Sequence, residues 1–472
     1  MLRKTKIVAT ISNLNGSPDF IKGLYRAGVN VVRLNTAYMT HDDAMQVIKN
    51  TREVSKKIGV LLDTKGPEIR TCDNDESLAV KYGDIIRIKG APGDKSQGDV
   101  VCVSYEHFVR DVPVGSSILI DDGHIALAVV EKDDAYLKCH VENDGRIDPR
   151  RSINIPSVHV KLPALSEKDI GFIKFAADND LDFIAHSFVR NKEDVIAVQK
   201  ILDTKQSSIK IIAKIENSQG VENINQILDH AYGIMIARGD LAVEIPKEQI
   251  PLIQKQIVKI CIEKRKPVIV ATQMLHSMIN SPIPTRAEVS DVANACLDHT
   301  DALMLSGETA NGKYPEVAVR TMANIAVEVE KKRSSFTNTP YPSDDKITAY
   351  LAKAAVKASL RLETKAIVAD TLTGKSIRAL AAYRCDNPIY AQVYDKQVTR
   401  QLSLSFGVFA EYLPFDMRKT ASLKPSIIRL LDRKLIKPED LIIVIAGSFD
   451  VKQGTSCIEI STAMNFKDTF TL

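Results

Sequence analysis

The stretch that decides the fold reads Lys210-Ile-Ile-Ala-Lys-Ile-Glu216, Gly233-Ile-Met-Ile-Ala-Arg-Gly-Asp240, Pro267-Val-Ile-Val-Ala-Thr-Gln273 and Ala302-Leu-Met-Leu-Ser-Gly-Glu308. Each of these four runs is apolar and ends on polar or charged residues. Apolar runs of this length between helical segments are typical of buried parallel strands. In barrels built from such strands, the loops after the carboxyl ends converge on one opening. The four runs therefore predict side chains that share one site.

Four further strand candidates precede this set, and segments with helical periodicity, such as Ser218–Asp229, fill most of the gaps between strands. Eight strands alternating with helices suit a closed parallel barrel, because closure leaves no exposed edge. We therefore expect an α/β fold with a (β/α)8 TIM barrel, and a long open doubly wound sheet is the competing topology. The four earlier candidates are Lys6–Ile11, Asn30–Asn35, Val60–Lys65 and Phe183–Val189.

A long insertion follows the third strand candidate. More than a hundred residues separate Lys65 from Phe183, and Gly or Asp turns recur about every ten residues, which is typical of a small antiparallel β module. We expect a small β-barrel over residues 69–160, inserted into a catalytic barrel of residues 1–68 and 161–335. The insertion would lie on the rim of the site as a lid domain.

A third domain is expected over residues 340–472, after a linker at Ser334–Lys346 that is rich in Ser, Thr, Asn, Pro and Asp. A new alternation of strands and helices predicts an open α/β sheet with helices on both faces. The strand candidates lie near Ala366–Asp370, Ile389–Val393, Val408–Leu413, Leu441–Ala446 and Ser456–Ile460.

Composition and charge limit which classes of protein the chain can belong to. A net charge of +4 over 472 residues gives no case for a nucleic-acid partner. Seven scattered cysteines without a Cys-x-x-Cys pair indicate reduced thiols in a cytoplasmic protein. The apolar run at Ile7–Ile11 is too short for a signal segment, and no stretch approaches the length of a membrane span.

Carboxylates gather at the predicted strand ends. Lys214 and Glu216 are two residues apart on one strand, so their side chains share a face, and Asp240 ends the next run. Two carboxylates about 4 Å apart repel by roughly 4 kcal/mol at an effective dielectric constant near 20. A raised pKa, a cationic side chain or a divalent metal would offset this repulsion, and oxygen ligands favour Mg²⁺ or Mn²⁺. The alternative is a plain Lys–Glu salt pair beside a Gly-Asp turn.

Longer motifs lie in order along the predicted barrel: Lys4-Thr-Lys-Ile-Val-Ala-Thr-Ile11, Asn30-Val-Val-Arg-Leu-Asn35, Asp63-Thr-Lys-Gly-Pro-Glu-Ile-Arg-Thr71, Lys214-Ile-Glu-Asn217, Ala237-Arg-Gly-Asp-Leu241, Ala271-Thr-Gln-Met-Leu275, Pro284-Thr-Arg-Ala-Glu-Val289, Asp291-Val-Ala-Asn-Ala295 and Met304-Leu-Ser-Gly-Glu-Thr309. These motifs, the place of the insertion and the tail domain resemble the pyruvate kinase family. This resemblance implies transfer of the phosphoryl group from phosphoenolpyruvate to ADP, which gives pyruvate and ATP in the last step of glycolysis.

Two rival functions stay open at this point. One is another metal-assisted enolate enzyme on the same barrel, such as a carbonyl–carbon lyase. The other is a catalytically silent protein that senses phosphorylated metabolites.

The resemblance implies a role for each charged residue at the barrel mouth. Glu216 and Asp240 would bind Mg²⁺ (or Mn²⁺), and Lys214 would neutralise the transferring phosphoryl group and the enolate. Arg33 would hold the phosphate through its planar guanidinium. Thr272 would close over the far side of the substrate carboxylate.

Two further elements of the substrate site follow from the same resemblance. Thr272 and Ser306 would pass a proton to the enolate carbon through ordered water, since a hydroxyl alone is a poor acid. The substrate carboxylate would bind main-chain N–H groups at Ala237, Arg238, Gly239 and Asp240.

Arg151 and Ala37 are departures from the family pattern in the implied nucleotide and K⁺ sites. Asn35, Arg70 and Arg151 would bind the nucleotide, and Arg151 stands where lysine is usual, which changes the donor geometry. Ala37 stands where the K⁺ site usually has a serine. We therefore expect a weaker K⁺ site, with water in place of one hydroxyl ligand. The remaining K⁺ ligands would be Asn35, Asp63 and Thr64.

The tail domain contains a candidate effector loop between a strand and a helix, where hydroxyls, a glycine and helix N–H groups form an anion nest. A capped helix is the alternative. By resemblance the loop would bind a sugar-phosphate effector, although the nearby loop Gly447–Thr455 offers only Lys452 as a cation for a second phosphate. Family precedent favours a homotetramer. The effector-binding candidates are Thr371, Thr373, Gly374, Lys375 and Ser376.

Overall fold

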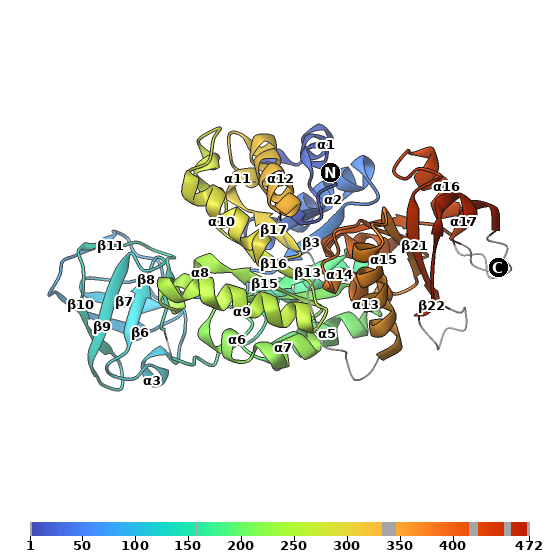
Figure 1. The fold of residues 1–472 in the computed structure, drawn as a ribbon. Coiled ribbons are helices and arrows are strands. Elements are labelled where there is room, and N and C mark those ends of the chain that lie inside the picture. The colour runs from blue at the N-terminus through green and yellow to red at the C-terminus, as the bar shows by residue number, and fades with distance from the viewer. Residues whose placement is uncertain (1, 157, 333–345, 415–422, 448–454, 470–472) are drawn as a thin grey trace.

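The computed structural model describes residues 2–156, 158–332, 346–414, 423–447 and 455–469. Three parts follow one another along its long axis: a β module, a barrel and a C-terminal sheet (Figure 1). The expected linker Ser334–Lys346 lies outside the described residues except for Lys346, which begins α13. None of the helices in the described ranges combines the length and the apolar character that crossing a membrane requires.

Eight parallel strands close into a barrel in the order β1-β17-β16-β15-β14-β13-β3-β2. This closure confirms the predicted TIM barrel, and the open doubly wound sheet is wrong. Alternate strand residues face the barrel interior, as Val8 and Leu61 do, or pack under the surrounding helices, as Ile7 and Val60 do. The strands are β1 (Lys6–Ile11), β2 (Val31–Asn35), β3 (Gly59–Asp63), β13 (Phe183–His186), β14 (Lys210–Ile215), β15 (Gly233–Ala237), β16 (Val268–Ala271) and β17 (Ala302–Leu305).

Helices and short 3₁₀ turns surround the barrel. Thr40, Ser166 and Thr285 each close a capping box with the acidic residue three positions later, which fixes where α2, α4 and α10 begin. The elements are η1 (Asn13–Asn15), α1 (Pro18–Ala27), η2 (Thr36–Tyr38), α2 (His41–Val54), α4 (Glu167–Asp178), α5 (Lys192–Thr204), α6 (Ser218–Glu222), α7 (Ile224–His230), α8 (Arg238–Glu244), η3 (Lys247–Gln249), α9 (Ile250–Glu263), η4 (His276–Ile279), α10 (Arg286–Leu297), α11 (Gly307–Ala310) and α12 (Pro315–Lys332).

The inserted module is a small curled sheet. Seven of its strands are ordered β4-β12-β8-β9-β10-β6-β7, and its two edges meet because Cys72 N donates to Cys102 O at 2.8 Å and Ser104 N donates to Arg70 O at 2.9 Å. β5 and β11 pair separately. The module contains β4 (Ile69–Arg70), β5 (Leu78–Val80), β6 (Ile85–Gly90), β7 (Val100–Val103), α3 (Phe108–Asp111), β8 (Ser117–Ile120), β9 (Ile125–Lys132), β10 (Leu137–Val141), β11 (Gly145–Ile147) and β12 (Ser152–Asn154).

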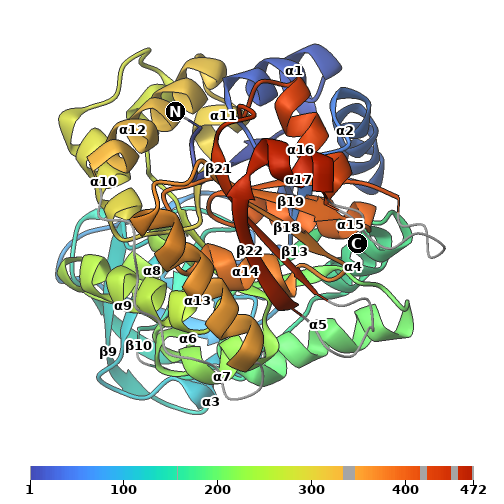
Figure 2. The ribbon, with the colours of Figure 1, turned by 45° about the vertical axis from the view of Figure 1, so that its right-hand side comes forward.

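The C-terminal sheet has the order β20-β19-β18-β21-β22, with β22 antiparallel to β21. Ile367 and Ala369 pack with α13 and α14 on one face, and Ala366 and Val368 pack with α16 and α17 on the other (Figure 2). The expected open sheet with helices on both faces is confirmed. Its elements are α13 (Lys346–Arg361), β18 (Ala366–Thr371), α14 (Lys375–Ala382), β19 (Ile389–Val393), α15 (Lys396–Gln401), η5 (Leu402–Leu404), β20 (Val408–Tyr412), α16 (Lys424–Asp432), β21 (Leu441–Gly447), β22 (Thr455–Thr462) and α17 (Ala463–Thr469).

Buried charges join the C-terminal sheet to the amino ends of the barrel strands. Arg384 Nη1 and Nη2 contact the Asp301 carboxylate at 3.0 and 2.6 Å, just before β17. Arg400 Nε contacts Asp182 Oδ1 at 2.6 Å, just before β13. The C-terminal domain thus contacts the end of the barrel opposite the predicted site.

Lys6 makes the stability of this junction depend on pH. Its Nζ donates to Val408 O at 2.6 Å and lies 4.5 Å from the centre of the Phe409 ring. Burial lowers the pKa of Lys6 to about 7; Arg3 lowers it further, while Glu330 and Asp301 oppose the shift.

Because the unfolded chain keeps this proton up to its ordinary pKa near 10.5, burying Lys6 costs stability at pH 7, and this cost shrinks as pH rises from about 7 toward 10. Lys6→Met is expected to melt at a higher temperature than the wild type at pH 7, with a smaller gain in melting temperature between pH 7 and 9. Thermal unfolding at several pH values measures this difference. Equal slopes for the two proteins would show that Lys6 stays protonated.

Candidate active site

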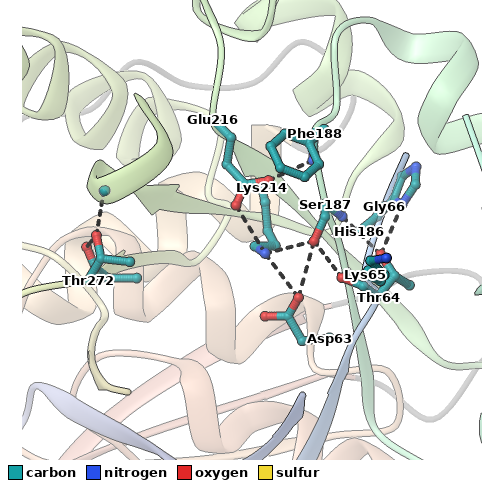
Figure 3. A network of polar contacts seen from close by, with 12 residues as sticks. Asp63, Thr64, Lys65, Gly66, His186, Ser187, Phe188, Lys214, Glu216 and Thr272 are labelled. Atoms are coloured by element: carbon teal, nitrogen blue, oxygen red, sulfur yellow. Dashed lines mark hydrogen bonds and ion pairs between the residues drawn. The ribbon is translucent and has the colours of Figure 1, made fainter. Parts of the chain in front are cut away.

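Lys214 lies at the carboxyl end of β14 and is only 8% exposed. Its Nζ contacts Asp63 Oδ1 at 3.0 Å, Glu216 Oε1 at 3.0 Å and Ser187 Oγ at 2.7 Å (Figure 3). Burial alone would lower the pKa of Lys214, but the charges of Asp63 and Glu216 outweigh burial and raise it above its ordinary value. The ammonium is therefore a fixed positive charge at neutral pH.

Asp63 connects Lys214 to a second cation. Its Oδ2 accepts a hydrogen bond from Arg33 Nε at 2.6 Å, and Arg33 Nη1 donates to Thr10 Oγ1 at 3.0 Å. Burial raises the pKa of Asp63, but Arg33 and Lys214 outweigh this effect and lower it below its ordinary value. The carboxylate thus holds a guanidinium and an ammonium from two different strands at one end of the barrel.

Glu216 and Asp240 are two carboxylates whose negative charges are only partly offset by nearby positive charge. Glu216 is 2% exposed, and its Oε2 accepts the main-chain N–H of Phe188 at 2.6 Å. Burial raises the pKa of Glu216 to about 7 against the opposing effect of Lys214, and the Asp240 charge adds to the rise. Burial also raises the pKa of Asp240. A nearby positive charge would stabilise both ionised groups.

These two oxygen donors fit a divalent metal. Across the described ranges, no three His, Cys, Asp or Glu side chains gather as a ready-made metal site. Two hard carboxylates suit Mg²⁺ or Mn²⁺, which commonly take their other ligands from substrate oxygens and water. The raised pKa values of Glu216 and Asp240 are the feature that such an ion would relieve.

Thr272 lies apart from the contacts of Lys214, on the side away from Ser187 (Figure 3). Its Oγ1 accepts the Gly239 N–H at 2.7 Å and donates to Ala271 O at 2.6 Å. Thr272 has a φ of 68°, which is a strained conformation for a β-branched residue and is found mainly at functional sites. The hydroxyl is thereby held at the carboxyl end of β16.

The segment Ala237–Asp240 runs from the end of β15 into α8. One of its N–H groups and the Arg238 side chain are already hydrogen-bonded within the protein. The Gly239 N–H is the one bonded to Thr272. The Arg238 side chain points to Asp291, with Nη1–Oδ1 and Nη2–Oδ2 distances of 2.7 and 2.8 Å, and also donates to Thr272 O. Arg238 therefore fixes the Thr272 loop with its side chain and has only its main chain left for a substrate.

Ser306 begins the turn after β17. Its N–H donates to Glu308 Oε2 at 2.8 Å, while Glu308 Oε1 accepts the Leu275 N–H at 3.1 Å. The buried Glu308 carboxylate thus connects the loops that follow β16 and β17. This link places Ser306 at the same mouth as Thr272.

A cavity of about 690 Å³ lies between the β module and the barrel. Asp240, Arg70 and Arg151 line it together, so the metal-site candidate and two nucleotide candidates face one space. Arg70 Nε contacts Glu68 Oε2 at 2.6 Å, and Arg151 contacts the carboxylates of Asp121 and Asp148 at 3.2 and 3.1 Å. The third nucleotide candidate, Asn35, is not among the lining residues.

Comparison with known proteins agrees with this geometry over nearly the whole chain. The family profile "Pyruvate kinase, barrel domain" matches residues 2–319, and "Pyruvate kinase, alpha/beta domain" matches residues 350–461. The chain belongs to the pyruvate kinase family.

Individual relatives extend this result. The pyruvate kinase of Borreliella burgdorferi is 45% identical over 97% of each chain. That of Geobacillus stearothermophilus is 42% identical over 95% of this chain and 78% of its own. A crystal structure of a pyruvate kinase from Cryptosporidium parvum superposes with a TM-score of 0.91 at 34% identity, covering 98% of this chain and 96% of that one.

The K⁺ candidates of this family member lie at neighbouring strand ends. Asn35 pairs in register with Asp63, and the Thr64 carbonyl accepts the Ser187 hydroxyl at 2.6 Å. Asn35 Oδ1 accepts the N–H of Ala37, the residue that replaces the usual serine. The oxygen donors suit a large monovalent cation, but Asp63 also bonds to Arg33 and Lys214.

The effector candidates form the loop that begins α14. Thr371 Oγ1 accepts the Gly374 N–H at 2.8 Å, and Thr373 Oγ1 accepts the Lys375 N–H at 3.4 Å. Ser376 Oγ donates to Asp370 O. The hydroxyls of the loop bond to its own main chain, while the N-cap residue of α14, Gly374, provides no side-chain cap. Lys452 lies outside the described residues.

Two residues that directly follow β13 belong to the site but were not predicted from the sequence. The strand ends at His186, so Ser187 and Phe188 form a turn that contacts Lys214 and Glu216. The polar residues His186 and Ser187 inside the run Phe183–Val189 are a signal that could have located this turn.

Proposed function

We propose that this protein transfers the phosphoryl group of phosphoenolpyruvate to ADP, which gives pyruvate and ATP. One observation carries the proposal: a buried ammonium, Lys214, lies between Asp63 and Glu216 and beside a carboxylate pair with raised pKa values. Phosphoryl transfer needs little more than positioned reactants and fixed charges that neutralise the moving group. Membership of the pyruvate kinase family supplies the reaction, and the geometry supports a role for each residue.

The cations of the site would hold the phosphoryl group. Arg33 would bind two of its oxygens through the guanidinium, which Asp63 and Thr10 keep oriented. Lys214 would neutralise the charge that develops as phosphorus leaves the enol oxygen. Glu216 and Asp240 would hold Mg²⁺ or Mn²⁺, which when bound supplies positive charge to the phosphate, carboxylate and enol oxygens of the substrate.

Departure of the phosphoryl group leaves an enolate that needs a proton on carbon. Thr272 and Ser306 end neighbouring strands, and their hydroxyls would pass this proton through ordered water. The substrate carboxylate would lie against the main chain of Ala237–Asp240, where the Asp240 N–H belongs to the first turn of α8. In that pose Thr272 would touch both the carboxylate and the proton path.

ADP would occupy the cavity between the β module and the barrel. Arg70 and Arg151 would bind its phosphates, and each now contacts carboxylates that a phosphate would compete with. Asn35, at the end of β2, would contact the nucleotide from beyond the residues that line the cavity. Closing of the module over the barrel would exclude water from the transfer.

Further properties belong to the proposal on family grounds. They are a cytoplasmic location, a homotetrameric assembly, activation by K⁺ and regulation by a sugar phosphate at Thr371–Ser376. No nucleic acid or membrane partner is expected.

A coupled assay tests the proposed reaction and its rivals. Purified protein with phosphoenolpyruvate, ADP, Mg²⁺ and K⁺ should produce pyruvate, which lactate dehydrogenase reports through oxidation of NADH. Release of pyruvate from a larger carbon compound, with no ATP formed, would favour a lyase. Binding of phosphorylated metabolites without any turnover would favour a sensor.

The K⁺ site predicts a salt-specific rate. Turnover should be faster in KCl than in equimolar NaCl or tetramethylammonium chloride. Ala37→Ser, which adds a hydroxyl at the residue that contacts Asn35, should reach half-maximal rate at a lower KCl concentration than the wild type. Equal rates in all three salts would remove K⁺ from the proposal.

A further inference from the structure

Ser187 has a buried hydroxyl that lies between the end of β14 and the loop after β3. It is 2% exposed, and its Oγ accepts a hydrogen bond from Lys214 Nζ at 2.7 Å and donates to Thr64 O at 2.6 Å (Figure 3). Its main-chain N–H donates to Thr64 Oγ1 at 3.0 Å. The hydroxyl therefore bridges the ammonium on β14 to the main chain after β3.

Phe188, the next residue, holds the other charged group of β14. Its N–H donates to Glu216 Oε2 at 2.6 Å, and its φ is 54°, a left-handed conformation that is a genuine outlier for a bulky side chain. Strained residues of this kind persist where the surrounding contacts hold them. Two adjacent residues of one turn thus contact both the lysine and the carboxylate.

Gly66, on the loop after β3, makes room for this turn. A Cβ at Gly66 would lie 2.8 Å from Phe188 Cδ2 and 2.9 Å from Ser187 Cβ, and the φ of Gly66 is 74°. Only glycine fits such a close approach without displacing the turn. The turn is therefore fixed from β3 as well as from β14.

We infer that Ser187 is a positioning residue for phosphoryl transfer, and that the turn Ser187–Phe188 aligns Lys214 with Glu216. This inference rests on the proposed function. The attraction of Lys214 to Asp63 and Glu216 depends weakly on direction, whereas a short hydrogen bond to a hydroxyl is directional and fixes where the third N–H of the ammonium points. A displacement of about 1 Å in such a group can cost about a hundredfold in rate.

Ser187→Ala tests the inference, because alanine keeps the size of the side chain and removes only the hydroxyl. We expect kcat to fall by about tenfold to a hundredfold, with unchanged KM for ADP and unchanged affinity for Mn²⁺. The calorimetric affinity for oxalate, a planar dianion that resembles the enolate, should fall with kcat. Ser187→Thr, which keeps the hydroxyl, should recover most of the activity.

Two further variants separate positioning from stability. Ser359→Ala removes a buried hydroxyl that donates to Val356 O in α13, far from the site, and should keep the wild-type kcat. Gly66→Ala pushes on the turn from outside and should lower kcat with the same unchanged KM for ADP.

Three results would overturn the inference. They are a Ser187→Ala enzyme with wild-type kcat and oxalate affinity, a drop in melting temperature without a drop in kcat, and a Ser187→Thr enzyme as slow as Ser187→Ala. An inactive wild type would instead refute the proposed function itself.

Discussion

Lys214→Met is expected to lower kcat by at least about a hundredfold, because a single preorganised charge of this kind contributes about 3–4 kcal/mol to the transition state. Methionine has nearly the shape of the lysine stem but no charge. The change also leaves the buried Asp63 and Glu216 carboxylates without their shared ammonium. Steady-state kinetics with phosphoenolpyruvate and ADP measure the loss, which should appear mainly in kcat.

Lys210→Met is the matched control for this variant. Lys210 begins the same strand that Lys214 ends, at the opposite end of the barrel. Its replacement should leave kcat close to the wild-type value. If Lys214→Met turned over at more than a tenth of the wild-type rate, the ammonium would not be the group that stabilises the transferring phosphoryl.

Glu216→Gln is expected to weaken metal binding strongly. Loss of even an outer-shell partner commonly costs about tenfold to a hundredfold in metal affinity, so loss of a direct ligand should cost about a hundredfold or more. Mn²⁺ binding, followed by electron paramagnetic resonance, measures this directly. Glu244→Gln, a change in the same cavity at a residue given no metal role, should bind Mn²⁺ as the wild type does.

The Glu216 carboxylate also makes metal binding depend on pH. Because burial raises the pKa of Glu216 to about 7, a proton competes with the metal, and Mn²⁺ affinity of the wild type should weaken as pH falls from 8 to 6. This dependence should be smaller in Glu216→Gln. Undiminished Mn²⁺ binding by that variant would exclude Glu216 as a ligand.

The strands could be predicted from the sequence because each is a short apolar run with a polar end. β1 matches its expected bounds, and the other barrel strands differ by a few residues, mostly at polar ends such as Lys65 and Asp240. Lys65 lies in the loop after β3, and Asp240 lies in the first turn of α8. The stretch expected as one helix over Ser218–Asp229 is divided into α6 and α7 at Asn223, whose side chain donates to Arg190 O.

Contacts between distant strands could not be predicted. Spacing places Lys214 and Glu216 on one face, but the two cations shared by Asp63 depend on how β2, β3 and β14 meet in the closed barrel. The direction of the Arg238 side chain depends on Asp291, fifty-three residues later. Ser187 was missed because the predicted strand Phe183–Val189 ran through it, whereas β13 ends at His186 and the turn begins at Ser187.

A crystal structure of the protein with Mn²⁺ and phosphoenolpyruvate, without ADP, is the most direct test of the central claim. We expect the anomalous signal of manganese between the carboxylates of Glu216 and Asp240, with Lys214 and Arg33 within hydrogen-bond distance of the phosphate. Manganese bound elsewhere, or a phosphate that neither cation touches, would contradict the account.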